Sequence, residues 1–211
     1  MSKGDLTRNR ILDEAMRLAS KDGLEGLTIG TLAEALSLSK SGLFAHFGSK
    51  EALQIAVLEH TRDRFHEKAA APLQAAAEGL PRLRALMSAW LDWIDDPELP
   101  GGCPLMGACF ELDDQEGGAR EKLVALQKRT QDHLTALVKE TMAAGHLDPK
   151  APIPQILFEL RATTLAYHIA TRVMRDPRAR PHAWAAFEAL VARYPAKRRG
   201  TPLDSSRKRR A

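Results

Sequence analysis

The sequence predicts an all-α fold of about nine helices. Apolar residues recur at intervals of three and four along nearly the whole chain, and no run alternates apolar and polar residues as a strand would. Alanine and leucine are abundant, while aromatic residues make up only 5% of the 211 residues. A chain of this length can bury a substantial core, as one large domain or two small ones. Helices packed on helices are therefore the expected architecture.

Capping and stop residues mark four helices in the N-terminal third. Gly23 is expected to end the first helix, because glycine readily adopts the left-handed conformation that follows many helices. Thr28, Ser39 and Ser49 are the expected N-caps of the next three, because their hydroxyl oxygens accept bonds from free backbone N–H groups. The predicted helices cover residues 6–22, 28–35, 39–46 and 49 to about 71.

Longer apolar stripes predict five further helices. They are separated by segments rich in proline, glycine and acidic residues, such as "DDPELPGG", "DDQEGG" and "DPKAPIP". The stripes cover residues 80–94, 104–112, 123–142, 153–174 and 184–194.

Charge is distributed unevenly along the chain. Residues 1–50 carry a net charge of +1, residues 51–194 carry −3, and residues 195–211 carry +6. The last segment is too polar to fold. We therefore expect a three-helix unit over 1–50, a larger domain over 51–194 and a disordered basic tail over 195–211. The tail could add salt-dependent DNA affinity, but a solvated terminus is the favoured interpretation.

Two cysteines, Cys103 and Cys109, are too few for a disulfide framework, which fits a reducing cytoplasm. The N-terminus lacks the apolar segment of a signal peptide, and no segment approaches 18 uninterrupted apolar residues. A cytoplasmic protein without a membrane partner is expected. The histidines and cysteines lack metal-ligand spacing, so neither a metal nor a cofactor is expected.

The helices over 28–35 and 39–46 have the length and spacing of a helix-turn-helix. An exposed helix face that offers a cation, a hydroxyl and an aromatic ring suits the major groove of DNA. The alternative is an ordinary helical hairpin with both Phe44 and Phe47 in the core. Phe47 is assigned to the core, and the residues alone leave Phe44 undecided. The inward positions are Leu32, Ala33, Leu36, Leu38 and Leu43, and the outward positions are Lys40, Ser41, Phe44, Ala45 and His46.

Phosphate contacts are expected beside this face. Thr28 and Ser39 lie at helix N-termini, where free N–H groups and the helix dipole favour an anion. Lys50 can reach another phosphate. Such contacts set the register and orientation of a protein on DNA but not its sequence choice.

The segment "GLEGLTIGTLAEALSLSKSGLFAHFGSKEAL", residues 23–53, closely resembles the DNA-binding region of tetracycline-repressor-type (TetR family) transcriptional regulators. The resemblance covers about 50 residues with the first helix included, and "GGCPLMGACFELDD" resembles a sixth-helix signature of one subgroup. It implies a homodimeric repressor that binds double-stranded DNA at a palindromic operator and responds to a small-molecule effector. Thr28, Ser39, Lys40 and Lys50 become phosphate contacts by this resemblance. Ser41, Gly42, Phe44 and His46 come to lie in or beside the recognition face.

Two positions depart from the family pattern. Phe44 stands where the family usually has tyrosine, so a hydrogen bond from a phenol hydroxyl is lost and only ring packing remains. Ser37 stands where the turn usually has glycine. Either serine tolerates that conformation, or the turn differs.

The last two predicted helices are the candidates for a dimer interface. The alternative is that their apolar stripes pack only within the chain. The resemblance implies a four-helix bundle across a two-fold axis. The residues assigned to this interface are Ile156, Leu160, Thr164, Trp184, Phe187 and Val191.

An effector pocket is expected between the DNA-binding unit and the dimer interface. Soft and flat side chains are concentrated in the fifth and sixth helices, which suits an apolar or aromatic small molecule. Core packing is the alternative for any single one of them. The fourth helix is expected to transmit a change in this pocket to the DNA-binding unit. The assigned residues are Met87, Trp90, Trp93, Met106, Cys109, Phe110, Tyr167 and His168.

Cys103 precedes Pro104 and is the expected N-cap of the sixth helix, where a thiol can become reactive. A thiol-based redox or electrophile sensor is therefore an alternative to effector binding, although a small buried residue in a tight turn is favoured. A remote alternative is an enzyme with Cys103 as nucleophile and His168 as base. The common catalytic and nucleotide-binding motifs are absent, so we expect no enzyme.

Overall fold

The computed structural model describes residues 3–196, and this part of the chain is built of helices without a strand. An all-α fold with an N-terminal helix-turn-helix is thereby confirmed. The only β-type pairing among the described residues is an isolated antiparallel bridge between Leu147 and Pro195. The predicted disordered tail lies outside the described residues from residue 197 onwards. The elements are α1 (Lys3–Gly26), α2 (Ile29–Leu36), α3 (Lys40–Phe47), α4 (Lys50–Ala75), α5 (Leu80–Ile94), α6 (Pro104–Glu111), α7 (Gly118–Ala143), α8 (Ile153–His168), the π-helical segment η1 (Ile169–Val173) and α9 (Ala179–Arg193).

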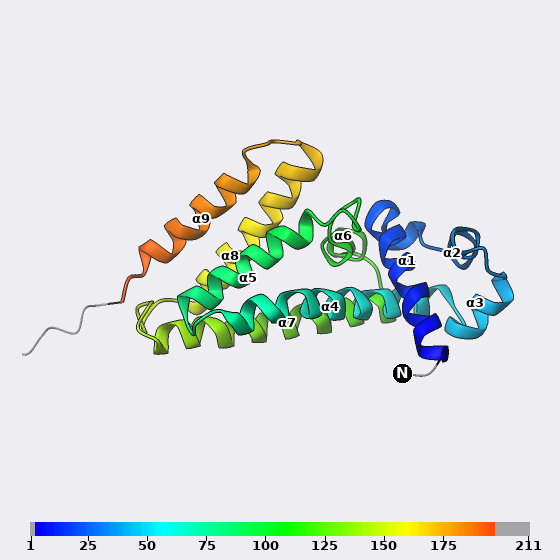
Figure 1. The fold of residues 1–211 in the computed structure, drawn as a ribbon, viewed down its shortest axis with the longest axis horizontal. Coiled ribbons are helices and arrows are strands. Elements are labelled where there is room, and N and C mark those ends of the chain that lie inside the picture. Colours follow the sequence, from blue (N-terminus) through cyan, green and yellow to red (C-terminus); the bar gives the residue numbers. More distant parts are fainter. Residues whose placement is uncertain (1–2, 197–211) are drawn as a thin grey trace, which may run out of the picture.

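The helices form an elongated molecule with α1, α2 and α3 at one end (Figure 1). The long helices α4 and α7 run side by side along the molecule, and α5 packs on α4. The helices α8 and α9 pack on each other away from α1–α3, and α6 lies against α1. We call α1–α3 the N-terminal unit.

The predicted caps of the N-terminal unit are present. Thr28 Oγ1 accepts a hydrogen bond from Thr31 N at 3.0 Å, and Thr31 Oγ1 accepts one from Thr28 N at 3.1 Å. These two bonds form a capping box. Ser39 Oγ accepts from Gly42 N at 3.1 Å, and Ser49 Oγ accepts from Ala52 N at 3.0 Å. These local bonds fix where α2, α3 and α4 begin.

Gly23 interrupts α1 where the sequence predicts its end. Its φ of 77° and ψ of 169° are not helical, although the helix resumes for one turn up to Gly26. A Cβ atom at Gly23 would lie 2.8 Å from the Glu111 carboxylate, so the Glu111 side chain would have to move. The backbone conformation is what requires glycine at this position.

Ser37 ends α2 in the left-handed conformation, with φ 54° and ψ 39°. Serine thus adopts the turn conformation in which the family pattern has glycine. A residue with a Cβ atom pays a steric penalty in this conformation that glycine avoids.

We expect Ser37→Gly to raise the free energy of unfolding by about 1 kcal/mol, because it removes this penalty. Urea denaturation followed by circular dichroism would measure the change. Ala35→Gly, at an exposed position inside α2, is the control and should lower the free energy of unfolding by about 1 kcal/mol. Loss of stability in Ser37→Gly would contradict a strained serine.

Several helix boundaries differ from the prediction; α7 begins at Gly118 and not at 123, and α9 begins at Ala179 and not at 184. Two further differences have a clear physical cause. Helix α4 continues past Pro72 to Ala75, because proline fits helical φ and in the last turn removes only one intrahelical bond. The predicted helix over 153–174 changes type after His168, where η1 begins. A π-helical turn places one extra residue in the helix, which shifts the direction of every following side chain.

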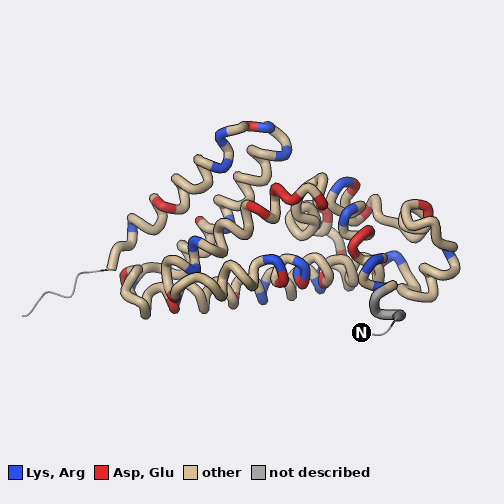
Figure 2. The backbone as a smooth tube through the Cα atoms, viewed as in Figure 1, with Lys and Arg blue, Asp and Glu red and all other residues tan. Residues whose placement is uncertain are grey.

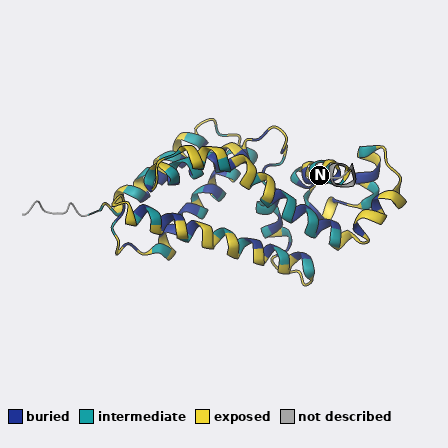
Figure 3. Cartoon of the chain, turned by 60° about the horizontal axis from the view of Figure 1, so that its bottom comes forward, coloured by how far each residue is buried: buried dark blue, intermediate teal, exposed yellow. Residues whose placement is uncertain are grey.

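The buried apolar residues form two clusters. The first joins the N-terminal unit and the start of α4 to residues of α6 and α7, such as Ala108 and Leu123. The second lies between α5, α7, α8 and α9 around Phe187. Buried residues follow the inward faces of the long helices, as Figure 3 shows. The core of the N-terminal unit is thus continuous with that of the larger domain.

None of the helices within residues 3–196 combines the length and the apolar character needed to cross a membrane.

Candidate nucleic-acid interface

Helix α3 exposes a polar face to solvent, and two apolar side chains on its other face pack into the core. Leu43 and Phe47 are buried, with 1% and 8% of their surfaces exposed. Phe44 points outward, with 57% exposed. This settles the position of both phenylalanines as the helix-turn-helix interpretation expects. The predicted contact residues on α3 that are exposed are Lys40, Ser41, Gly42, Phe44 and His46.

Arg8 fixes the far end of α3 to α1. Its Nη1 atom donates to the His46 carbonyl at 3.0 Å, and its guanidinium lies 4.8 Å from the centre of the Phe47 ring. A cation over an aromatic face stabilises the contact beyond simple packing. Sequence reasoning missed Arg8, since its partner lies 38 residues away.

Thr28, Gly30 and Lys40 come together at the N-terminus of α2. A Cβ atom on Gly30 would lie 3.5 Å from Thr28 Oγ1 and 3.8 Å from Lys40 Nζ, so both groups lie beside the first turn. Lys40 has no carboxylate partner among the described residues. An ammonium group, a hydroxyl and the free N–H groups of a helix start together favour a phosphate.

Ser39 adds a further hydroxyl at the start of α3. Its oxygen accepts bonds from Gly42 N and from Ser41 Oγ, the latter at 3.3 Å. A serine oxygen can accept two bonds and still donate its own proton. The Ser39 proton is therefore available to an anion.

Lys50 is held by the N-terminal unit itself. Its Nζ atom donates to the carbonyl oxygen and to Oε2 of Glu25, each at 2.9 Å. Hydrogen bonds from Lys50 and from Gln54 lower the pKa of the Glu25 carboxyl. Lys50 therefore differs from Lys40, because a contact between Lys50 and DNA would have to compete with the ion pair between Lys50 and Glu25.

We expect Glu25→Gln to tighten binding to duplex DNA by about threefold to tenfold at low salt, because Lys50 loses its carboxylate partner, keeps only the bond to the Glu25 carbonyl and can neutralise a phosphate. The slope of log affinity against log salt should steepen by about 0.9. Fluorescence anisotropy with a labelled duplex at four salt concentrations would measure both quantities.

Glu14→Gln is the matched control for this experiment. It removes the same charge, from an ion pair with Arg17 on α1, and leaves Lys50 bound to Glu25. Equal salt slopes for the two variants would contradict the inhibitory role of Glu25.

Charges of both signs are mixed over the N-terminal unit (Figure 2). Ion pairs join several of them, including Arg17 with Glu14 and Lys50 with Glu25. Any affinity of this unit for DNA therefore depends on a few individual basic side chains such as Lys40, and not on a broad basic surface.

The eight residues predicted to form an effector pocket do not share one environment. Met87 and Tyr167 belong to the second core cluster, and Trp93 to the first. Phe110 is 61% exposed. Trp90, Met106, Cys109 and His168 are half-buried. Trp93 Nε1 and His168 Nδ1 are buried, and neither has a hydrogen-bond partner among the described residues.

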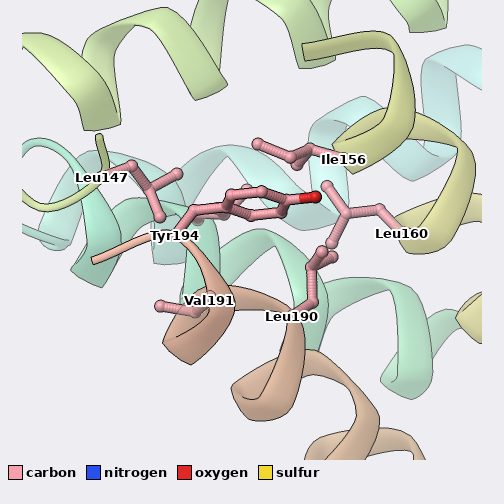
Figure 4. A pocket seen from close by; sticks show the side chains of 7 residues that line it. Leu147, Ile156, Leu160, Leu190, Val191 and Tyr194 are labelled. Atoms are coloured by element: carbon pink, nitrogen blue, oxygen red, sulfur yellow. The ribbon is translucent and has the colours of Figure 1, made fainter. Parts of the chain in front are cut away.

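Two hollows in the described part of the chain lie elsewhere. One of about 10 Å³ surrounds the Tyr194 ring, as Figure 4 shows, and has room for about one water molecule. The other is an open depression of about 510 Å³ along the acidic segment 113–121. Neither is lined by a residue of the predicted pocket.

Four of the six residues predicted at the dimer interface are buried in the chain's own core. Ile156, Leu160, Thr164 and Phe187 are between 0% and 6% exposed, and Ile156 and Leu160 point at Tyr194 in Figure 4. A side chain that its own chain already covers has no surface left for a partner. The structure thus corrects these four assignments, and only Trp184 and Val191 keep partial exposure.

The solvent-facing sides of α8 and α9 carry a different set of apolar residues. Phe158 is 69% exposed and Ile169 is 46% exposed. Alanines occupy half of the remaining exposed positions of α8, η1 and α9, and the others include prolines and polar residues. The exposed apolar residues include Phe158, Ala162, Ala166, Ile169 and Val173 on α8 and η1, and Ala185, Ala186, Ala189 and Ala192 on α9.

Cys103 is the N-cap residue of α6, as predicted, but its environment suppresses thiolate formation. Burial raises the pKa of its thiol, against smaller opposing effects of Trp93 and of the N–H groups of Met106 and Leu105. The pKa of the Cys109 thiol is also raised by burial. A protonated thiol at neutral pH is the opposite of what a thiolate sensor requires. The raised pKa of the half-buried Cys103 therefore argues against a thiolate sensor at this position.

Nothing in the described residues brings Cys103 and His168 into a catalytic pair. His168 lies against Gly102, where a Cβ atom would be 2.5 Å from its Cε1 atom. Burial, with a smaller effect of Arg172, lowers the pKa of His168. Residues 3–196 also contain no group of three or more His, Cys, Asp or Glu side chains arranged to hold a metal ion.

Two family models match the chain, and together they span most of it. The model described as "Bacterial regulatory proteins, tetR family" matches residues 11–57. The model described as "Tetracyclin repressor-like, C-terminal domain" matches residues 79–187. The first contains α2 and α3, and the second reaches from α5 into α9.

Curated relatives and solved structures agree with these models. The HTH-type transcriptional repressor ComR of Escherichia coli is 27% identical over 169 residues, which cover 78% of this chain and 79% of ComR. The HTH-type transcriptional regulator RutR of Escherichia coli is 29% identical over 167 residues, covering 76% and 73% of the two chains. A TetR transcriptional regulator from Chloroflexus aurantiacus superimposes with a TM-score of 0.80 at 25% identity, over 93% of this chain and all of that one.

Proposed function

The chain belongs to the tetracycline-repressor family of DNA-binding transcriptional regulators, which are not enzymes, and from this we propose that it is a cytoplasmic repressor. In our proposal it binds a palindromic operator as a homodimer and leaves it when a small effector binds. The observation that carries the proposal is the exposed face of α3, which offers Ser41, Phe44 and His46 beside Lys40, a lysine without an ion pair in the described part of the chain.

Helix α3 enters the major groove in this proposal. Ser41 and His46 have the hydrogen-bonding groups that base edges require. Phe44 packs its ring against the sugar–phosphate backbone, because it has no hydroxyl to donate. Lys40, Thr28 and Ser39 hold phosphates on either side, and these contacts fix the orientation of α3.

The exposed faces of α8 and α9 support a homodimer. Alanines at these positions allow helices of two copies to approach closely, and Phe158 and Ile169 supply apolar surface. Two copies paired across a two-fold axis form a four-helix bundle from these helices. Residues 1–50 then act as the DNA-binding domain, and residues 51–194 as the sensing and dimerisation domain.

The proposed effector site lies where α4, α5 and α6 meet. Phe65 stacks on Trp90 with ring centres 6.3 Å apart and meets Trp93 edge-on at 5.8 Å. Nearby on α6, Cys109 packs against the core cluster that contains Trp93, whereas Met106 packs against the cluster around Phe187. An apolar or aromatic molecule is the chemistry that such a lining favours.

A bound effector has two routes to the DNA-binding domain. Helix α4 continues directly from α3 through Gly48 and Ser49. Helix α6 offers the second, since Glu111 Oε2 accepts from Glu25 N at 3.0 Å. Reversing a 99:1 preference for the DNA-binding state requires about 5.5 kcal/mol of differential effector affinity.

Selection of binding sites from random duplexes with the full chain tests the proposal. We expect enrichment of a palindrome whose half-sites are about one helical turn, roughly 34–36 Å, apart. Phe44→Ala and Lys40→Ala should each abolish enrichment at the protein concentration that suffices for the native chain. Lys128→Ala, on the exposed side of α7, is the control and should leave it intact. Failure of the native chain to enrich any sequence would refute the proposal.

A further inference from the structure

The segment between α5 and α6, residues 95–102, joins the N-terminal unit to the helices that we assign to the dimer. We call it the α5–α6 loop. On one side it contacts α1 through Ser20, whose hydroxyl donates to the Gly102 carbonyl at 2.7 Å. In return Gly101 N donates to Ser20 Oγ at 2.9 Å. The loop and α1 are therefore joined by two reciprocal hydrogen bonds.

The contact with α1 leaves no free space. A Cβ atom on Gly101 would lie 1.6 Å from the Ser20 carbonyl oxygen and 3.0 Å from Lys21 Cα. These neighbours are backbone atoms, which cannot turn away as a side chain can. Displacement of the α5–α6 loop toward α1 therefore displaces α1 itself.

Arg172 of η1 holds the other side of the loop. Its Nε atom donates to the Ile94 carbonyl at 3.0 Å, and Nη1 donates to the Pro100 carbonyl at 3.0 Å. Its Nη2 atom donates to the Leu99 carbonyl at 2.9 Å and also to Ile94. Since Ile94 ends α5, the guanidinium also lies at the negative end of that helix dipole.

Arg172 has no carboxylate partner within residues 3–196. Its guanidinium donates instead to backbone carbonyls of this loop and of Ile94 at the end of α5. Neighbouring side chains reinforce the attachment. The Tyr167 hydroxyl donates to Asp95, Arg180 pairs with Asp95 at 3.3 Å, and the His168 ring lies against Gly102. Lysine could not replace Arg172, because one ammonium group cannot reach three carbonyls in fixed directions.

The π-helical turn gives Arg172 this position. The Met174 N–H bonds to Ile169 O at 3.1 Å, five residues back, and so closes the wider turn of η1. Such turns shift the direction of side chains and frequently occur at functional sites.

We infer that Arg172 is a positioning residue that sets the separation of the two α3 helices in the dimer. This inference rests on the proposed function, since it assumes a dimer formed by α8 and α9. Arg172 holds the loop against η1, which continues α8, and the loop holds α1 through Ser20. Helix α1 in turn holds α3 through Arg8, whose guanidinium contacts both His46 and Phe47.

The readout that separates positioning from general stability is the dependence of affinity on half-site spacing. The probes are the selected palindrome and versions with two base pairs added to or removed from its centre. For the native chain, affinity should fall steeply when the spacing changes. For Arg172→Lys, the ratio of affinities for the original and altered spacings should fall about tenfold, the size expected when one coupling contact is lost.

Two further variants complete the experiment. Arg175→Lys, at an exposed arginine without a described partner, should keep the native spacing profile. Ser20→Ala removes the hydrogen bonds between α1 and the α5–α6 loop, so it should give the same spacing profile as Arg172→Lys. The test therefore remains valid even if one of the two variants folds poorly.

Equal loss of affinity at every spacing, or an unchanged profile in both Arg172→Lys and Ser20→Ala, would overturn the inference. A native chain that binds no operator would instead refute the proposed function, so the two failures are distinguishable.

Discussion

Phe158→Glu is expected to convert the protein to a monomer and to lower operator affinity by at least about 100-fold, the usual advantage of two linked contacts over one. Phe158 is 69% exposed on the outer face of α8. In a two-fold dimer each copy presents the same residue, so two carboxylates would be buried near each other without partners. The fold of the single chain should be unaffected, because this side chain lies outside its core.

Sedimentation velocity would measure the oligomeric state, and anisotropy with the selected operator would measure affinity. Val124→Glu is the matched control, because it adds the same charge at an exposed apolar residue of α7, which lies outside the proposed interface. The control should remain a dimer with native affinity. A Phe158→Glu protein that is still dimeric would place the interface elsewhere.

Gly101→Ala is expected to lower the free energy of unfolding by about 3 kcal/mol or more, because overfilling a packed site forces the backbone to move. The added methyl group would overlap the Ser20 carbonyl oxygen at 1.6 Å. The variant should also bind the operator weakly even where it is folded, since α1 must shift to make room. Thermal and urea denaturation measure the first effect, and anisotropy measures the second.

Gly107→Ala is the control for this substitution. Gly107 lies inside α6, and its nearest neighbour to an added Cβ atom is Glu111 Oε1 at 3.6 Å, an ordinary contact. Alanine is the better helix former, so this variant should be more stable by up to about 1 kcal/mol. A Gly101→Ala protein of native stability would mean that the loop and α1 separate easily.

Local rules explain why the helix-turn-helix could be predicted closely. Caps such as Thr28 and Ser39 act within three residues, so their partners are visible in the sequence. The burial of Leu43 and Phe47 follows from helical periodicity in the same way. Ser37 was an open question only because its conformation depends on how tightly α2 and α3 cross.

Four of the six residues predicted at the dimer interface lie in the chain's own core, and the reason is physical. Periodicity identifies the most apolar face of a helix, but it does not say whether the same chain or a second copy covers that face. Ile156 and Leu160 lie on the most apolar face of α8, and this face is buried in the chain's own core. The outer face is marked by small residues and a single Phe158, which is a weaker pattern in a sequence.

Contacts between residues far apart in the chain could also not be predicted from the sequence. Lys50 meets Glu25 across 25 residues, and no spacing rule connects them. Arg172 binds backbone carbonyls, which every residue possesses, so its partners leave no trace in the sequence. The predicted pocket residues were dispersed for a similar reason, because whether soft side chains line a cavity or fill a core depends on packing in three dimensions.

The most direct test of the central claim is the ratio of affinities for the selected palindrome and for a scrambled duplex of equal length, measured at one salt concentration. If α3 recognises base edges, the native chain should prefer the palindrome by about 1,000-fold or more. A variant with Ser41, Phe44 and His46 all changed to alanine should lose that preference and keep its salt-dependent affinity for the scrambled duplex. A native chain that binds both duplexes equally would contradict sequence-specific recognition by α3.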